Sequence, residues 1–182
     1  MGLEPKVYKN FITEDERIQL LEYSRAIPLF VNSKYSAGSD EKWVVNESGP
    51  YGSRCFAKLD GTRYSTSLVQ LLFRRIIETI ELENPVIDPM IGQIISVIKP
   101  NGLIHAHRDQ YTDPKYKGKH NLRFNIMVDR GEDISYNPII ANTVYEVGKG
   151  DAWCFNASKD LHKTDTISGP ENRVVYQFGF IV

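Results

Sequence analysis

Two histidines and one aspartate combine residue types and a spacing that suit a metal ion. His107 and Asp109 are two residues apart, and His162 follows far downstream. Side chains two apart on a β-strand share a face, so His107 and Asp109 can point at one ion. Two imidazoles and one carboxylate can occupy one face of an iron octahedron and leave the opposite face open, which is where oxygen chemistry takes place. Arg173 heads an apolar terminal run, where its charge would need a fixed anion such as an acidic co-substrate.

The segments around these residues are predicted to be strands separated by turns. Ile91–Ile98 is β-branched and apolar, residues 99–102 carry a turn signal, and Leu103–His107 resumes the strand pattern. His162 lies in a second strand region after Gly150–Phe155. The sequence therefore predicts that the metal-binding residues are presented by neighbouring strands.

The chain is predicted to form one domain, 1–182, with helices first and strands after. A capping box at Thr13 and Glu16 starts a helix of about 13–25, and a broad apolar stripe indicates a second helix over 65–82 that covers a sheet. From residue 91 onward, short strands with turns fit a double-sheet jelly roll. Residues 1–90 would then give helical support, with 32–64 as a substrate lid or a surface loop, and residues 91–182 would form the core strands.

The order His107-Arg108-Asp109, then His162, then Arg173 resembles the Fe(II)/2-oxoglutarate-dependent oxygenases, over roughly residue 91 to the C-terminus. The segment Gly150-x-x-Trp153-x-x-Asn156 is most similar to the aspartyl/asparaginyl hydroxylase and free-proline hydroxylase branch. The resemblance implies a cupin-like double-stranded β-helix backed by the helices. It also implies Fe(II) at the two histidines and Asp109, 2-oxoglutarate chelating that iron with its far carboxylate on Arg173, and O2 in the remaining position.

Further candidates flank these residues. Arg123 and Asn125 alternate with apolar neighbours in 122–128, so we expect both to face the barrel interior. In the hydroxylases that the chain resembles, this strand carries Arg-x-His, which binds substrate or 2-oxoglutarate carboxylates; here Asn125 stands at the histidine position. We assign Asn125 to the co-substrate and Arg123, Trp153 and His105 to the substrate. Trp153 has a structural alternative in the core, and His105 one as a buried residue near the metal.

His105 with His107 also opens a cupin-type His-x-His interpretation. That motif requires a glutamate three or four residues further on, where Gln110 and Tyr111 stand instead. We therefore do not expect His105 to be a ligand.

Composition excludes several classes of partner. The net charge of -1 gives no reason to expect nucleic acid, and no apolar run approaches a membrane span. Two distant cysteines without a signal peptide indicate reduced thiols in a cytoplasmic protein. The expected function is hydroxylation of a small polar molecule, a free amino acid or derivative. A peptide or protein residue is the alternative substrate, and a non-catalytic cupin-like barrel that binds metal or ligand is the alternative of another class.

Overall fold

The computed structural model describes residues 4–27, 30–31, 54–89, 91–111 and 113–182. Their helices are α1 (Glu14–Ala26) and α2 (Ser67–Thr79), with short 3-10 turns at Pro114–Tyr116 and Ile134–Tyr136. The larger sheet follows the order β1 (Lys6–Tyr8), β10 (Ala152–Asn156), β7 (Asn121–Asp129), β12 (Arg173–Ile181), β5 (Gln93–Ile98), β3 (Arg54–Lys58) and β2 (Phe30–Val31), with β4 (Val86–Ile87) paired to β12. The smaller sheet follows the order β6 (Ile104–His107), β11 (His162–Thr164), β8 (Pro138–Ile140) and β9 (Thr143–Val144).

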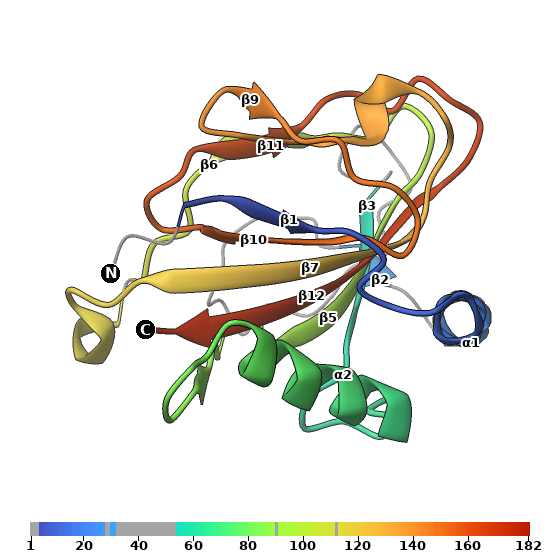
Figure 1. Ribbon diagram of the computed structural model, residues 1–182. Coiled ribbons are helices and arrows are strands. Elements are labelled where there is room, and N and C mark those ends of the chain that lie inside the picture. The colour runs from blue at the N-terminus through green and yellow to red at the C-terminus, as the bar shows by residue number, and fades with distance from the viewer. Residues whose placement is uncertain (1–3, 28–29, 32–53, 90, 112) are drawn as a thin grey trace.

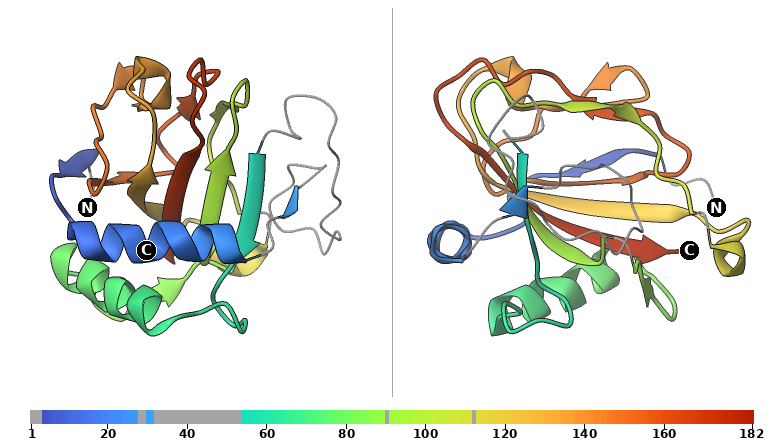
Figure 2. Two further views of the ribbon diagram at one scale, coloured as in Figure 1. Left: turned by 90° about the vertical axis from the view of Figure 1, so that its right-hand side faces the viewer. Right: turned by 180° about the vertical axis from the view of Figure 1, so that it is seen from behind.

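The two sheets face each other, and the helices cover the outer face of the larger one (Figures 1 and 2). All the strand pairs are antiparallel. This arrangement confirms the predicted double-sheet jelly roll with flanking N-terminal helices. It also fixes where a site can form, because inward side chains of both sheets meet in the space between them.

The helices begin where the sequence signals them. Thr13 caps α1 and forms the predicted capping box with Glu16, whose carboxylate also receives Arg75 of α2 at 2.6 Å. The helix α2 is shorter than the predicted 65–82, because Thr66 is its N-cap and it ends at Thr79. Its buried face, with Val69 fully buried, packs against the outer face of the larger sheet.

Alternation along the central strands separates two apolar layers. On β7, Phe124 and Ile126 belong to the core under the helices, whereas Met127 packs between the sheets with Trp153 and Phe155. Arg123 and Asn125 lie on the inner face, as their alternation predicts. Both cysteines are buried and free, and none of the described helices has the length and apolarity needed to cross a bilayer.

The strand β3 differs from the expectation for residues 32–64, which the sequence presented as one long connection. Residues 54–58 pair with β5 along their whole length and are largely buried. Residues 32–53, the first part of the predicted lid or loop, lie outside the described residues. The N-terminal half therefore contributes strands to the larger sheet as well as helices, through β1 and β3.

Candidate active site

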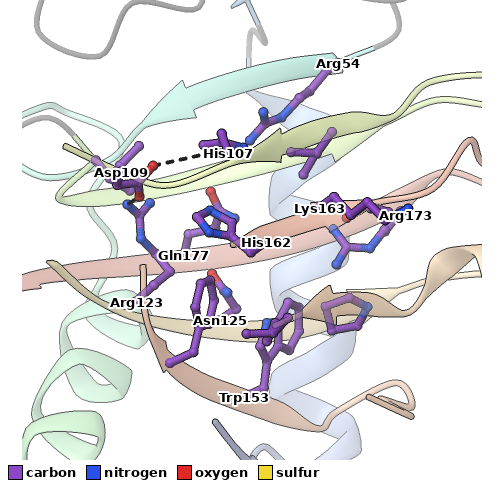
Figure 3. A pocket seen from close by; sticks show the side chains of 16 residues that line it. Arg54, His107, Asp109, Arg123, Asn125, Trp153, His162, Lys163, Arg173 and Gln177 are labelled. Atoms are coloured by element: carbon purple, nitrogen blue, oxygen red, sulfur yellow. Dashed lines mark hydrogen bonds and ion pairs between the residues drawn. The ribbon is translucent and has the colours of Figure 1, made fainter. Parts of the chain in front are cut away.

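The two histidines and the aspartate that were predicted to bind metal lie together at the ends of two paired strands (Figure 3). His107 ends β6 and His162 begins β11, and the antiparallel register sets them opposite each other with ring centroids 4.2 Å apart. Asp109 lies just beyond β6, where its backbone N–H donates to the Ala157 carbonyl at 2.8 Å. Its Oδ1 is 3.4 Å from Nε2 of His107. One ligand atom of each residue lies within 4.8 Å of the others, so a single ion can contact all three.

Both imidazoles are oriented by a backbone carbonyl two residues earlier. Nδ1 of His107 donates to the His105 carbonyl at 2.7 Å, and Nδ1 of His162 donates to the Asp160 carbonyl at 3.0 Å. A carbonyl oxygen can only accept, so each Nδ1 carries the proton and each Nε2 keeps its lone pair. Histidines that ligate metals are oriented in this way by their second nitrogen.

The protonation states of the cluster also suit a cation. Burial, followed by the neighbouring His107, lowers the pKa of His162 to about 4. Burial alone would raise the pKa of Asp109, but the adjacent Arg123 guanidinium, followed by His107 and His162, holds it well below its usual range. At neutral pH His162 is therefore uncharged and Asp109 is ionised, which are the forms that coordinate a metal ion.

Arg173 is a buried cation at the other end of the same region. Its side chain is 2% exposed, its Nε donates to the Tyr136 carbonyl at 2.8 Å, and its guanidinium lies 5.5 Å from the centre of the Trp153 ring. Burial, followed by Arg54 and Arg130, lowers its pKa to about 9, so it remains charged at neutral pH. Among the residues that the structure describes, no carboxylate forms an ion pair with it. A buried charge in this state favours binding of an anion.

The metal-binding candidates and Arg173 line one cavity between the two sheets. The cavity contains about 500 Å³ of empty space, including its open mouth. Asp109 and Arg123 lie at one end, and Arg173 lies with Lys163 toward the other (Figure 3). Except for His105, every site residue expected from the sequence lines it: His107, Asp109, Arg123, Asn125, Trp153, His162 and Arg173.

His105 has a different place from the one expected. Its side chain is exposed and is not among the residues that line the cavity. In the part of the chain that the structure describes, β6 forms an edge of the smaller sheet, and residues 105–106 of this strand are exposed. The residue contributes to the site through its backbone carbonyl, which holds His107.

Arg123 contacts Asp109, a contact that differs from the substrate-binding role expected for it. Its Nη2 donates to Asp109 Oδ2 and lies 3.7 Å from Oδ2 of Asp88, and the residue is only 4% exposed. Asp88 itself is fully buried. Asp88 lies next to the site because distant strands pair, and local sequence patterns could not predict that pairing.

Polar side chains on the central strands complete the inner wall. Asn125 is paired in register with Trp153 on one side and Gln177 on the other. Oδ1 of Asn125 is buried and has no hydrogen-bond partner among the described residues, a state that costs about 1–3 kcal/mol unless a ligand supplies the partner. Gln177 was not predicted, although its alternation with Arg173 on β12 placed it on the same face.

Arg54 is a second lining residue that the sequence analysis did not identify. Ile98 of β5 is paired with Arg173 on one side and with Arg54 on the other, so the two arginines share one row of the inner face. The alternation of Arg54 and Phe56 with the small residues Cys55 and Ala57 was the available signal. The alternation did not lead to a predicted strand because residues 54–58 fall inside the long connection expected over 32–64.

Sequence comparison finds no protein-family model and no curated protein that matches this chain. Solved structures do match it in three dimensions. A viral collagen prolyl hydroxylase from Paramecium Bursaria Chlorella virus-1, in complex with 2-oxoglutarate, has a TM-score of 0.61 at 12% identity, over 99% of this chain and 96% of that one. An oxidoreductase of the 2OG-Fe(II) oxygenase family from Burkholderia pseudomallei has a TM-score of 0.67 at 11% identity, over 97% and 83% of the two chains.

A third match is HygX from Streptomyces hygroscopicus, solved with nickel, 2-oxoglutarate and hygromycin B. Its TM-score is 0.64 at 10% identity, over 97% of this chain and 82% of that chain. At such low identity these matches establish the fold, which is the double-stranded β-helix of 2-oxoglutarate oxygenases. What the site binds must be argued from its own residues.

Those residues fit a divalent cation together with a dicarboxylate. Two neutral imidazoles and one ionised carboxylate form a donor set that suits iron and leaves part of its coordination sphere open. Arg173 offers a planar, charged fork for a carboxylate at the far end of the cavity. A ligand with one end at the ion and a carboxylate at Arg173 would therefore satisfy both groups.

Proposed function

We propose that this chain is an Fe(II)/2-oxoglutarate-dependent dioxygenase that hydroxylates an unactivated C–H bond of a small polar substrate, a free amino acid or a derivative. One observation carries the proposal: His107, Asp109 and His162 share a cavity with Arg173, a buried guanidinium that has no carboxylate partner among the described residues. A metal site alone would not require the arginine, and an anion site alone would not require the triad.

In the proposed reaction, substrate C–H, 2-oxoglutarate and O2 give substrate C–OH, succinate and CO2. A ferrous ion held by His107, Asp109 and His162 would supply the oxygen activation. Arg173 would hold the distal carboxylate of 2-oxoglutarate, with Trp153 against the guanidinium to fix its plane. Asn125, on the wall between these groups, would complete its hydrogen bonds with the co-substrate. The apolar side chains between the sheets would limit the access of water to the reacting centre.

The polar wall of the cavity supports a small polar substrate. Arg54, Lys163 and Gln177 line it together with the metal candidates and can bind polar groups. The matched structures include one with the small molecule hygromycin B and one that is a collagen prolyl hydroxylase, so both substrate classes occur on this fold. We place the chain nearest the aspartyl/asparaginyl and free-proline hydroxylases, on its segment around Trp153. We also place it in the cytoplasm, on its two free thiols.

Anaerobic addition of Fe(II) and then 2-oxoglutarate tests the site directly. An oxygenase should develop the weak visible charge-transfer band of the iron chelate, and His162→Ala should not. A barrel that binds metal without turnover would bind iron and show no such band, which would reject the proposal. Succinate release, screened over free amino acids, their derivatives and short peptides, then identifies the substrate class. Release only with peptides would overturn the small-molecule assignment and leave the chemistry intact.

A further inference from the structure

A group of buried polar residues lies around Arg123, which contacts Oδ2 of Asp109. Asp88 and Asn121 are fully buried, and Arg123 is 4% exposed. Nδ2 of Asn121 donates to Oδ2 of Asp88 and also lies 2.9 Å from the Tyr111 hydroxyl. Asn121 Oδ1 accepts from Arg123 at 3.2 Å. Two carboxylates therefore flank one guanidinium, with an amide side chain joining Asp88 to Arg123.

A glycine makes this arrangement possible. Gly179 of β12 is paired in register with Arg123 of β7, and its backbone carbonyl accepts from the N–H of Asp88 at 2.9 Å. A Cβ placed on Gly179 would lie 2.9 Å from Cβ of Asp88, closer than real Cβ atoms approach, and 3.0 Å from its Oδ2. Glycine inside a strand commonly marks such a close approach. Gly179 thus leaves the space in which Asp88 reaches Arg123.

The contacts of Asp109 differ between its two oxygens. Oδ1 lies 3.4 Å from Nε2 of His107, whereas Oδ2 accepts from Nη2 of Arg123. The same Nη2 lies 3.7 Å from Oδ2 of Asp88, so two carboxyl groups share one nitrogen of the guanidinium, and the second of them is fully buried. A buried guanidinium with this geometry is stable only while its carboxylates stay in place, and each carboxylate is in turn held by it.

We propose that Arg123 is a positioning residue that restricts Asp109 to one ligating oxygen, and that Asp88, in the space at Gly179, holds Arg123 in that task. This inference rests on the proposed function, because it takes His107, Asp109 and His162 as the metal ligands. A carboxylate can ligate a metal through one oxygen or two. With Oδ2 on Arg123, only Oδ1 faces the histidines, and the positions needed for co-substrate and oxygen stay open.

The first test compares the wild type with Arg123→Gln, using Mn²⁺ as the probe and then 2-oxoglutarate. In crystal structures of the Mn²⁺ forms, Asp109 should ligate through one oxygen in the wild type and through both in the variant. The dissociation constant of 2-oxoglutarate should rise on the order of 10-fold to 100-fold, the size of the loss in metal affinity or activity that follows removal of a residue orienting a metal ligand. Arg75→Gln is the matched control, because it removes an arginine that is also paired with a carboxylate, Glu16, but lies outside the cavity. It should leave both properties unchanged.

Two variants that keep Arg123 test the role of Asp88 and cover a failure of Arg123→Gln to fold. Asp88→Asn and Gly179→Ala should each weaken 2-oxoglutarate binding in the same direction. Asp88→Asn should add nothing when Arg123 is already glutamine, because it acts through that residue. Additive effects would overturn the chain of contacts.

The proposal is also overturned if Asp109 ligates Mn²⁺ through one oxygen in Arg123→Gln with unchanged 2-oxoglutarate affinity, or if that variant loses affinity only for the prime substrate. Failure of the proposed function has a different signature. A wild type that binds Mn²⁺ at the three residues but no 2-oxoglutarate rejects the oxygenase, while the coordination of Asp109 in the two crystal structures still decides the role of Arg123.

Discussion

Replacement of Arg173 by methionine separates the role of an anion site from that of a structural ion pair. Methionine keeps much of the buried volume and removes the charge. The pKa of Arg173 lies at about 9, so at pH 7 the charged form is favoured by two pH units, or about 2.7 kcal/mol. Replacing buried ionic groups by apolar residues of similar volume is often neutral or stabilising, by roughly 1–4 kcal/mol for a whole ion pair. Against this, the Tyr136 carbonyl loses the donor that now lies at 2.8 Å, a cost of about 1–3 kcal/mol.

The two effects nearly cancel, so the ligand-free variant should unfold with a free energy within about 2 kcal/mol of the wild type. Binding of 2-oxoglutarate should suffer much more. Loss of a charged hydrogen bond costs about 1.5–3 kcal/mol, which raises the dissociation constant on the order of 10-fold to 100-fold. Mn²⁺ affinity should persist, because Arg173 contacts none of the three candidate ligands.

Denaturant unfolding with Mn²⁺, with and without 2-oxoglutarate, measures both properties together. At a ligand concentration 100 times the wild-type dissociation constant, the wild type gains about 2.7 kcal/mol, whereas the variant should gain only about 0.4–1.4 kcal/mol. Arg75→Met serves as the control for replacing an arginine outside the cavity and should keep the wild-type gain. A variant that is destabilised by more than about 4 kcal/mol but binds 2-oxoglutarate normally would show that Arg173 is a structural residue.

Three further predictions concern the other cavity residues. Alanine at His107, Asp109 or His162 should abolish substrate-dependent succinate formation, and circular dichroism should show that the fold is retained. His105→Ala should keep iron affinity within a modest factor. Full activity in His162→Ala would reject the metal site. Between pH 7 and pH 5, the metal-free wild type should lose about 2 kcal/mol more stability than His162→Gln. The pKa of His162 is lowered from 6.5 to about 4 in the folded protein, so over this pH range the folded state binds fewer protons than the unfolded chain. Equal pH slopes in denaturant unfolding would contradict that pKa. Asn125→Leu should not lower the stability of the ligand-free protein, since Oδ1 of Asn125 has no hydrogen-bond partner among the described residues. The variant should bind 2-oxoglutarate more weakly in calorimetry. Unchanged affinity would remove Asn125 from the co-substrate site.

Local patterns were sufficient to predict much of this site. The alternation in 122–128 placed Arg123 and Asn125 on the inner face, and the His-x-Asp pair at the end of an apolar strand placed two metal candidates side by side. The capping box at Thr13 located the start of the first helix. Each of these signals depends on residues within a few positions of one another, where side-chain direction follows from the local backbone.

Contacts between distant segments could not be predicted in the same way. The strand β3 forms because residues 54–58 pair with β5, and the short alternation within that segment does not by itself distinguish it from the loop expected there. Arg123 has the residue type and the side-chain direction expected for a substrate contact. Its partner Asp88 can approach it only because Gly179 has no side chain. The role of an inward-facing arginine is therefore decided by which anions the fold brings to it.

At each end of the cavity, burial disfavours the charged form of one side chain. Among the described residues that line it, Asp109 is the only carboxylate, whereas Arg54, Arg123, Lys163 and Arg173 supply cationic side chains. Burial disfavours a proton on His162 at one end and weakens the hold of Arg173 on its proton at the other. A divalent cation would use the neutral imidazole that the first effect provides, and an anion would stabilise the charge that the second opposes. Because each ligand then brings the opposite charge to the other, we expect metal and dicarboxylate to bind with positive cooperativity, measurable as tighter 2-oxoglutarate binding in the presence of Mn²⁺ than in its absence.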